Sequence, residues 1–132
     1  MYSAKLLDHF EHPRNAGEIA DADAIGEIEN PACGDLLRLT LKVVGGQIVD
    51  IQFKAKGCVP SIACASALTE LIRGKSIQEA RSLDRNRLGD LVGRLPQAST
   101  HAAQLALDAL AAALNSLPSK NQNFAVQISR NK

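Results

Sequence analysis

The residues of this chain best suited to chemistry are two cysteines, Cys33 and Cys58, which both lie in predicted loops beside glycine. Cys33 precedes Gly34 and Asp35. Cys58 follows Gly57 and stands directly before a predicted helix, whose positive end favours a negatively charged sulfur. Thiolates bind zinc and iron and are also nucleophiles. We therefore interpret both cysteines as metal or sulfur ligands rather than as inert core thiols.

Two further side chains could complete a metal site with the cysteines. Asp35 offers a hard carboxylate oxygen close to Cys33, although it could equally cap a turn or face solvent. His101 stands in the first turn of the last predicted helix, whose positive end favours the neutral ring that a metal ion binds. Two thiolates, a carboxylate and an imidazole form a four-coordinate set that suits zinc or iron. Spacing alone does not choose between these metals.

The other histidines and the third cysteine are expected to lie outside this site. His9 and His12 flank the end of the first predicted helix, where both are expected to be solvated. Cys64 shares a helical stripe with Leu68 and Leu71, which predicts a buried core position.

A predicted β-hairpin brings the two cysteines together. Alternating apolar residues over 37–43 and 49–55 indicate two half-buried strands, and the turn residues Gly45-Gly46 separate them. Pairing these strands leaves Cys33 within one residue of facing Cys58, so that the two thiols converge at one end of the hairpin.

The apolar pattern also predicts the register of the hairpin. A two-residue loop at the glycines would place Leu39 opposite Gln52, an apolar residue against a polar one. A shift by one residue instead places Leu39 opposite Phe53 or Ile51 and implies a three-residue loop with one glycine at positive φ. We therefore predict the shifted register.

Helical patterns surround the hairpin. The sequence predicts a short helix over 2–10 that caps the sheet, a brief strand over 24–28, a helix from Pro60 to about Arg73, a short helix opened by the capping box Ser76-Ile77-Gln78-Glu79, one or two turns within 83–92, and a last helix from Ser99 or Thr100 to about Leu117. The last helix carries an apolar stripe that is expected to pack on the sheet: Ala103, Leu107, Leu110, Leu114 and Leu117. The predicted fold class is α+β, with a three-stranded antiparallel sheet packed against several helices. We predict one domain over 1–117 and a polar, flexible tail over 118–132.

Composition limits the classes of partner and the compartment. The chain of 132 residues carries 15 Lys and Arg against 14 Asp and Glu, and its basic residues form no stripe with the one Tyr and three Phe. Nucleic-acid binding is therefore not supported. No apolar run could span a bilayer and the N-terminus does not open a secretory signal, so we expect a cytoplasmic protein away from membranes. Three cysteines in such a chain favour metal binding or thiol chemistry over disulfides.

Taken in order, several motifs resemble the IscU/NifU family of iron-sulfur cluster assembly scaffolds. The motifs are Leu7-Asp8-His9-Phe10 with Pro13-Arg14-Asn15, Pro31-Ala32-Cys33-Gly34-Asp35, Gly57-Cys58 with Ser61-Ile62-Ala63, Leu68-Thr69-Glu70, and His101 with Leu105-Ala106-Leu107-Asp108-Ala109-Leu110. The resemblance covers Tyr2 to about Leu117 and implies the α+β fold of IscU and SufE.

The resemblance also implies a function, which is that of a scaffold without catalytic turnover. Its site is Cys33, Asp35, Cys58 and His101, which hold iron or a transient [2Fe-2S] cluster, with zinc as an alternative or resting occupant. A cysteine desulfurase supplies the sulfur, for which Cys58 is the favoured persulfide acceptor. Apo iron-sulfur proteins then receive the cluster.

The chain departs from the family pattern at two places. The third family cysteine directly follows the histidine, and that position here is Ala102. The methyl group of Ala102 cannot bind iron, so the chain lacks the third thiol of the family site. A homodimer that shares ligands is one way to supply that thiol. The segment Leu95-Pro96-Gln97-Ala98-Ser99 keeps only Leu-Pro of the motif that a dedicated chaperone binds in many relatives, which leaves chaperone docking open.

Two other functions stay open at this point. The first is a zinc-binding regulatory paralogue that docks on the desulfurase or on a client protein without building clusters. The second is a thiol sulfurtransferase that uses Cys58, which is less favoured because the sequence shows no general base near that thiol.

Overall fold

The computed structural model describes residues 2–30, 34–93 and 95–117. Its elements, in chain order, are α1 (Ala4–Glu11), β1 (Ala24–Asn30), β2 (Asp35–Val44), β3 (Gln47–Lys56), α2 (Val59–Ile72), α3 (Ile77–Arg81), α4 (Arg85–Leu91), the 3-10 helix η1 (Gln97–Ser99) and α5 (Thr100–Asn115). The strands form one antiparallel sheet in the order β1-β2-β3. The predicted α+β class and three-stranded sheet are therefore confirmed. The tail predicted over 118–132 lies outside the described residues.

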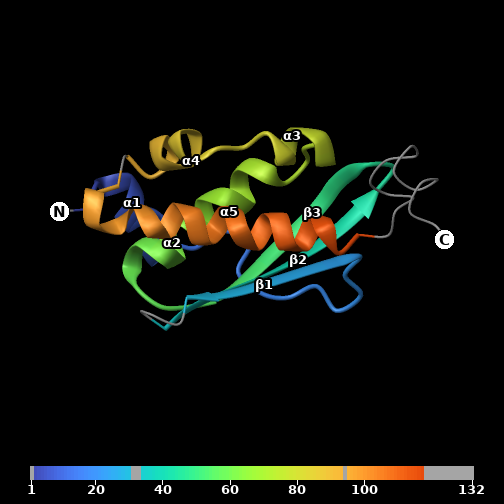
Figure 1. Cartoon of the computed structure of the whole chain (residues 1–132), viewed down its shortest axis with the longest axis horizontal. Helices are drawn as coiled ribbons and strands as arrows, with labels where there is room; N and C mark the ends of the chain where they lie inside the picture. The colour runs from blue at the N-terminus through green and yellow to red at the C-terminus, as the bar shows by residue number, and fades with distance from the viewer. Residues whose placement is uncertain (1, 31–33, 94, 118–132) are drawn as a thin grey trace.

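The helices cover one face of the sheet (Figure 1). Helix α5 packs on β1 and β2, helix α2 packs on β3, and α1 and α4 pack in turn on α2. The strand residues that face these helices are almost fully buried: Leu37, Leu39, Leu41, Ile51 and Phe53. Among the described residues, no helix has the length and apolar character needed to cross a bilayer.

The β2–β3 hairpin confirms the shifted register over most of its length. Leu39 pairs with Phe53 and Leu41 pairs with Ile51, so that apolar residues share the face that points to the helices. This pairing runs to Leu36 and Lys56, directly before the end of the hairpin that carries the candidate site.

The predicted three-residue loop of the hairpin is wrong. The strands pair right up to Gly45 and Gly46, which form a two-residue loop. Their φ angles of 58° and 80° are the positive values that the tight loops of hairpins require. An irregularity between Lys42 and Val43 shifts the register by one residue. One bulge therefore accommodates both the glycine loop and the apolar pairing.

Helix α5 approaches β1 closely at Gly26. A Cβ atom at Gly26 would collide with the backbone of Ala109 and Ala113 in α5. The predicted stripe of α5 is buried as expected except for Leu107, which is only partly buried. The closest contact between α5 and β1 is therefore made at alanines beside that stripe. Their small side chains let the helix backbone lie directly against the sheet.

Helix α2 is buried on nearly all sides between α1, α5 and β3. Its start agrees with the prediction, since Cys58 is the N-cap residue and Pro60 lies in the first turn. Cys64 is fully buried, as predicted. Burial raises the pKa of the Cys64 thiol to about 12.

Helix α1 packs mainly against α2, so the prediction that it caps the sheet is wrong. The expectation that His9 is solvated is also wrong, because only 7% of this residue is exposed. His9 Nδ1 lies 2.8 Å from Ser66 Oγ, which also accepts a hydrogen bond from the Arg14 N–H at 2.8 Å. The interface between α1 and α2 buries this polar group with a partner. His12 is exposed, as expected.

Candidate metal centre

Three segments that are far apart in the sequence meet at one end of the sheet. Asp35 begins β2, Cys58 precedes α2, and His101 lies in the first turn of α5. A carboxylate oxygen, a sulfur and a ring nitrogen of these residues all lie within 4.8 Å of one another. The structure thus brings together three of the four residues that the sequence predicted for the site. The fourth, Cys33, lies outside the described residues.

The Asp35 carboxylate is the centre of this cluster. Its Oδ2 lies 3.3 Å from Cys58 Sγ and 3.6 Å from His101 Nε2. Its Oδ1 accepts a hydrogen bond of 3.2 Å from the Cys58 N–H. Only 2% of Asp35 is exposed, so the alternative of a carboxylate that faces solvent is wrong.

The position directly after β3, Gly57, has to be glycine for the Asp35 carboxylate to lie where it does. Gly57 has a φ of 151°, in a region that side chains disfavour. A Cβ atom on Gly57 would also collide with the carboxylate of Asp35. The Gly57-Cys58 sequence therefore allows the end of the hairpin to close over the carboxylate.

Ser61 is a site residue that the sequence analysis missed. It is 4% exposed, and its hydroxyl donates to Asp35 Oδ2 at 2.6 Å. Its Oγ also lies 3.1 Å from Cys58 Sγ. The available signal was its position three residues after the N-cap Cys58, from which a side chain can reach back to the start of the helix.

The cluster is buried on one side and open on the other. Cys58 is partly exposed, and the side chain of His101 is 40% exposed, whereas Asp35 and Ser61 are buried beneath them. A metal ion or a protein partner can therefore reach the sulfur and the imidazole from solvent. Cys64 is fully buried in the core, and Ala102 is 1% exposed and carries no donor atom.

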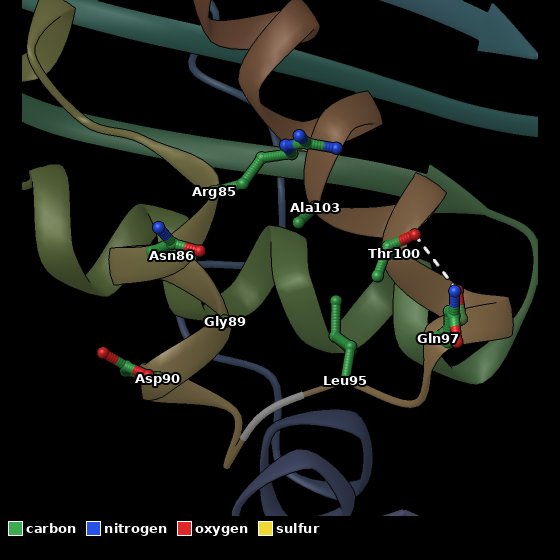
Figure 2. A pocket seen from close by; sticks show the side chains of 8 residues that line it. All are labelled: Arg85, Asn86, Gly89, Asp90, Leu95, Gln97, Thr100 and Ala103. Atoms are coloured by element: carbon green, nitrogen blue, oxygen red, sulfur yellow. Dashed lines mark hydrogen bonds between the residues drawn. The ribbon is translucent and has the colours of Figure 1, made fainter.

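A hollow of about 660 Å³ lies beside the start of α5, between this helix and α4 (Figure 2). Leu95 and Gly89 line it together with Thr100, whose hydroxyl donates to the Gln97 carbonyl at 3.1 Å. None of the three clustered donors lines this hollow. The hollow is therefore separate from the candidate metal centre, although Thr100 directly precedes His101.

The chemistry of the donor set suits zinc or iron. Sulfur, imidazole nitrogen and carboxylate oxygen are all zinc ligands, and cysteine and histidine also bind iron in iron-sulfur centres. The structure also places a possible general base beside the Cys58 thiol, which the sequence did not indicate. The Asp35 carboxylate lies 3.3 Å from the Cys58 sulfur, so a base is within reach of that thiol after all.

A helix-covered antiparallel sheet with a thiol, a carboxylate and an imidazole at its end defines an α+β protein with a candidate metal site. Comparison with known proteins identifies the family. Residues 1–124 match the model of the NifU-like N terminal domain, and the chain belongs to this family.

Relatives of known description agree with this assignment. The chain is 45% identical over 114 residues to the "Iron-sulfur cluster assembly scaffold protein IscU 1" of Archaeoglobus fulgidus, which covers 86% of this chain and 74% of the relative. It is 39% identical over 117 residues to the IscU scaffold protein of Haemophilus influenzae, which covers 86% of this chain and 92% of the relative.

Solved structures show the same fold. The putative SUF-system scaffold protein of Fervidobacterium islandicum superposes with a TM-score of 0.72 at 28% identity, over 86% of this chain and 96% of the neighbour. The N-terminal NifU-like protein of Brucella abortus superposes with a TM-score of 0.76 at 21% identity, over 89% and 94% of the two chains, which supports the fold alone.

Proposed function

We propose that this chain is a scaffold of iron-sulfur cluster assembly, which holds iron or a transient [2Fe-2S] cluster as cargo and passes it to apo iron-sulfur proteins. The observation that carries the proposal is the convergence of Asp35, Cys58 and His101 within 4.8 Å at a partly open site. Membership of the NifU-like family and the scaffold names of its relatives support it. The scaffold has no catalytic turnover of its own.

Each site residue has a proposed role. Cys33 and Cys58 act as thiolate ligands, and His101 supplies a nitrogen donor. The Cys58 thiolate also accepts sulfur from a cysteine desulfurase: it attacks the terminal sulfur of the desulfurase persulfide, a new S–S bond forms on Cys58, and the desulfurase thiolate leaves. The partial exposure of Cys58 gives the desulfurase access.

Asp35 is the labile ligand that eases release of the cargo. A hard carboxylate is a weak partner for sulfide-rich iron. The hydrogen bond from the Cys58 N–H also gives this carboxylate a stable position when it is not bound to metal. A ligand with two such states can let the cluster go.

The proposal has consequences for partners and assembly. Because Ala102 offers no third sulfur, a homodimer that shares ligands is the proposed route to a complete thiolate set. The partners are a cysteine desulfurase and apo iron-sulfur proteins in the cytoplasm. Chaperone docking at Leu95-Pro96 stays an open part of the proposal.

The test is anaerobic reconstitution with ferrous iron and sulfide. The unmodified chain is expected to give a visible iron-sulfur chromophore, which Cys58→Ser or Cys33→Ser abolishes. Cys64→Ala is the matched control, because Cys64 is fully buried in the core and its loss is expected to leave the chromophore in place. A colourless product from the unmodified chain contradicts the proposal.

A second candidate is the zinc-binding regulatory paralogue. It is favoured by the carboxylate oxygen of Asp35 and the ring nitrogen of His101, because both are common zinc ligands. Protein purified without added iron would then contain stoichiometric zinc that does not exchange for iron. Exchangeable zinc instead fits a resting scaffold.

The thiol sulfurtransferase stays a third candidate. The Asp35 carboxylate, 3.3 Å from the Cys58 sulfur, is a base within reach of that thiol. This function requires repeated turnover of persulfide sulfur from Cys58 to a small acceptor, which a sulfur-release assay measures directly.

A further inference from the structure

The start of α2 places one hydroxyl against two candidate ligands at once. Ser61 Oγ lies 2.6 Å from Asp35 Oδ2 and 3.1 Å from Cys58 Sγ. The hydroxyl is buried and belongs to the first turn of α2, so its position is fixed by the packed helix rather than by a loop. None of these contacts is needed to form the backbone of the helix.

The hydrogen inventory of Ser61 limits what it can do. A serine hydroxyl has a single hydrogen and two acceptor lone pairs. The short contact to Asp35 uses that hydrogen, because an ionised carboxylate only accepts. The Cys58 thiol donates its one hydrogen to the same Asp35 Oδ2, at 3.3 Å, and its sulfur lies 3.1 Å from Ser61 Oγ. The hydroxyl and the thiol therefore meet at one carboxylate oxygen, and the sulfur lies within reach of the hydroxyl.

We propose that Ser61 is a positioning residue of the metal centre: it fixes the Asp35 carboxylate beside Cys58 and His101, and it turns its hydroxyl to the Cys58 sulfur when a metal engages Asp35. This inference rests on the proposed metal-binding function. If a metal took the lone pair of Asp35 Oδ2 that this hydrogen meets, the hydroxyl would turn to the sulfur, which lies 3.1 Å away. Ser61 thereby sets both the affinity for the metal and the character of the metal–sulfur bond.

Positioning is favoured over direct ligation for Ser61. Protein ligands of zinc are cysteine, histidine and carboxylates, and a neutral hydroxyl is not among them. Groups that hold a ligand by hydrogen bonding are instead a regular part of metal sites, and their removal costs about 10- to 100-fold in affinity. Ser61, which holds the buried Asp35, fits this second description.

The test is an anaerobic titration with Co²⁺, which substitutes for zinc or ferrous iron and reports sulfur ligation by a charge-transfer band. Ser61→Ala is expected to bind Co²⁺ about 10-fold or more weakly than the unmodified chain. At saturation its sulfur-to-cobalt band is expected at longer wavelength, since a thiolate without a hydrogen-bond donor gives up its electron more easily.

Ser66→Ala is the matched control. Ser66 lies in the same helix, is fully buried, and hydrogen-bonds to His9 and to the Arg14 N–H instead of to the site. This variant loses a buried hydroxyl of the same kind, so it reproduces any general cost to folding. It is expected to keep the Co²⁺ affinity and the band position of the unmodified chain, with circular dichroism recorded for both variants.

The outcomes separate the inference from the function on which it rests. If the unmodified chain binds no Co²⁺, both the inference and the proposed metal site are overturned. If it binds Co²⁺ and Ser61→Ala matches it in affinity and band position, the inference alone is overturned. If Ser61→Ala unfolds, the same pair is compared in the Gly89→Ala background, which is expected to be more stable, and the same criteria apply.

Discussion

At the scale of single residues, the candidate site depends on where one carboxylate is held. Asp35 is buried, and a buried carboxylate needs donors or a cation around it. Two such donors come from the start of α2, namely the N–H of its N-cap residue Cys58 and the Ser61 hydroxyl. The lack of a side chain at Gly57 leaves the space in which they meet. The site is therefore sensitive to small changes next to Asp35.

Gly57→Ala is expected to weaken metal binding by displacing Asp35. The new Cβ would meet the carboxylate, and a non-glycine residue at a φ of 151° adds backbone strain of about 1–3 kcal/mol. Zinc affinity, measured by competition with a chelator, is expected to fall by at least about 10-fold, the usual effect of disturbing ligand geometry.

Gly74→Ala provides the control for the strain alone. Gly74 also has a positive φ, of 86°, but a Cβ there meets no atom within 4 Å. This variant is expected to lose stability and to keep its zinc affinity. An equal loss of affinity in both variants would mean that collision with Asp35 is not the cause.

The buried histidine predicts how stability depends on pH. Desolvation, and then the charge of Arg14, lower the pKa of His9 below its ordinary value of 6.5. Below pH 6.5 the unfolded chain therefore binds a proton that the folded chain does not. The contribution of His9 to the free energy of unfolding is therefore fully present above pH 6.5. It is lost as the pH drops from 6.5 toward the lower pKa of the folded state.

Urea unfolding at pH 7.5 and pH 5.5 measures this effect. The midpoint of the unmodified chain is expected to fall at the lower pH, and the fall is expected to be smaller in His9→Gln, which cannot take up the proton. His12→Gln, at an exposed position, is expected to behave like the unmodified chain. If His9→Gln keeps the full fall, His9 is not its source.

At the scale of elements, the contact of α5 with β1 fixes where His101 lies, because that residue starts the same helix. Gly26→Ala is expected to push α5 from the sheet, since its Cβ would collide with the backbone at Ala109 and Ala113. A helix backbone cannot step aside as a side chain does, so the cost is expected to reach or exceed about 1–3 kcal/mol.

Gly89→Ala is the same chemical change with the opposite expected sign. Gly89 lies inside α4, and a Cβ there meets no atom within 4 Å. Replacing a glycine in a helix by alanine is expected to raise the free energy of unfolding by about 0.5–1 kcal/mol. Urea unfolding of the two variants checks both values, and a stable Gly26→Ala would contradict the close packing of α5 on β1.

The hairpin shows how far its sequence pattern could be read. Alternation of apolar residues correctly predicted that Leu39 faces Phe53, because only that register buries both. The same pattern led to the wrong loop, because it assumed one register for the whole hairpin. A bulge between Lys42 and Val43 changes the register near the turn, and no residue type in the sequence marks it.

At the scale of the whole molecule, the site could be predicted only in part. Local patterns placed Asp35 and Cys58 at the same end of a hairpin, and the structure joins them by a hydrogen bond. The position of His101 beside Asp35 and Cys58 depends on how α5 crosses the sheet. The periodicity of strands and helices in the sequence does not encode this crossing. Resemblance to a family supplied that step. Ser61 and His9 were missed because buried polar groups are identified by their partners, and those partners are distant in sequence.

Because the donors come from β2, the start of α2 and the start of α5, metal binding is expected to stabilise the entire fold. Unfolding separates these segments, so a metal that binds mainly the folded chain shifts the equilibrium toward it. Free zinc at about 100 times its dissociation constant is expected to add about 2.7 kcal/mol to the free energy of unfolding. Urea unfolding with and without zinc measures this gain, which Cys58→Ser and His101→Ala are expected to reduce strongly. An equal gain in those variants would show that zinc binds elsewhere on the chain.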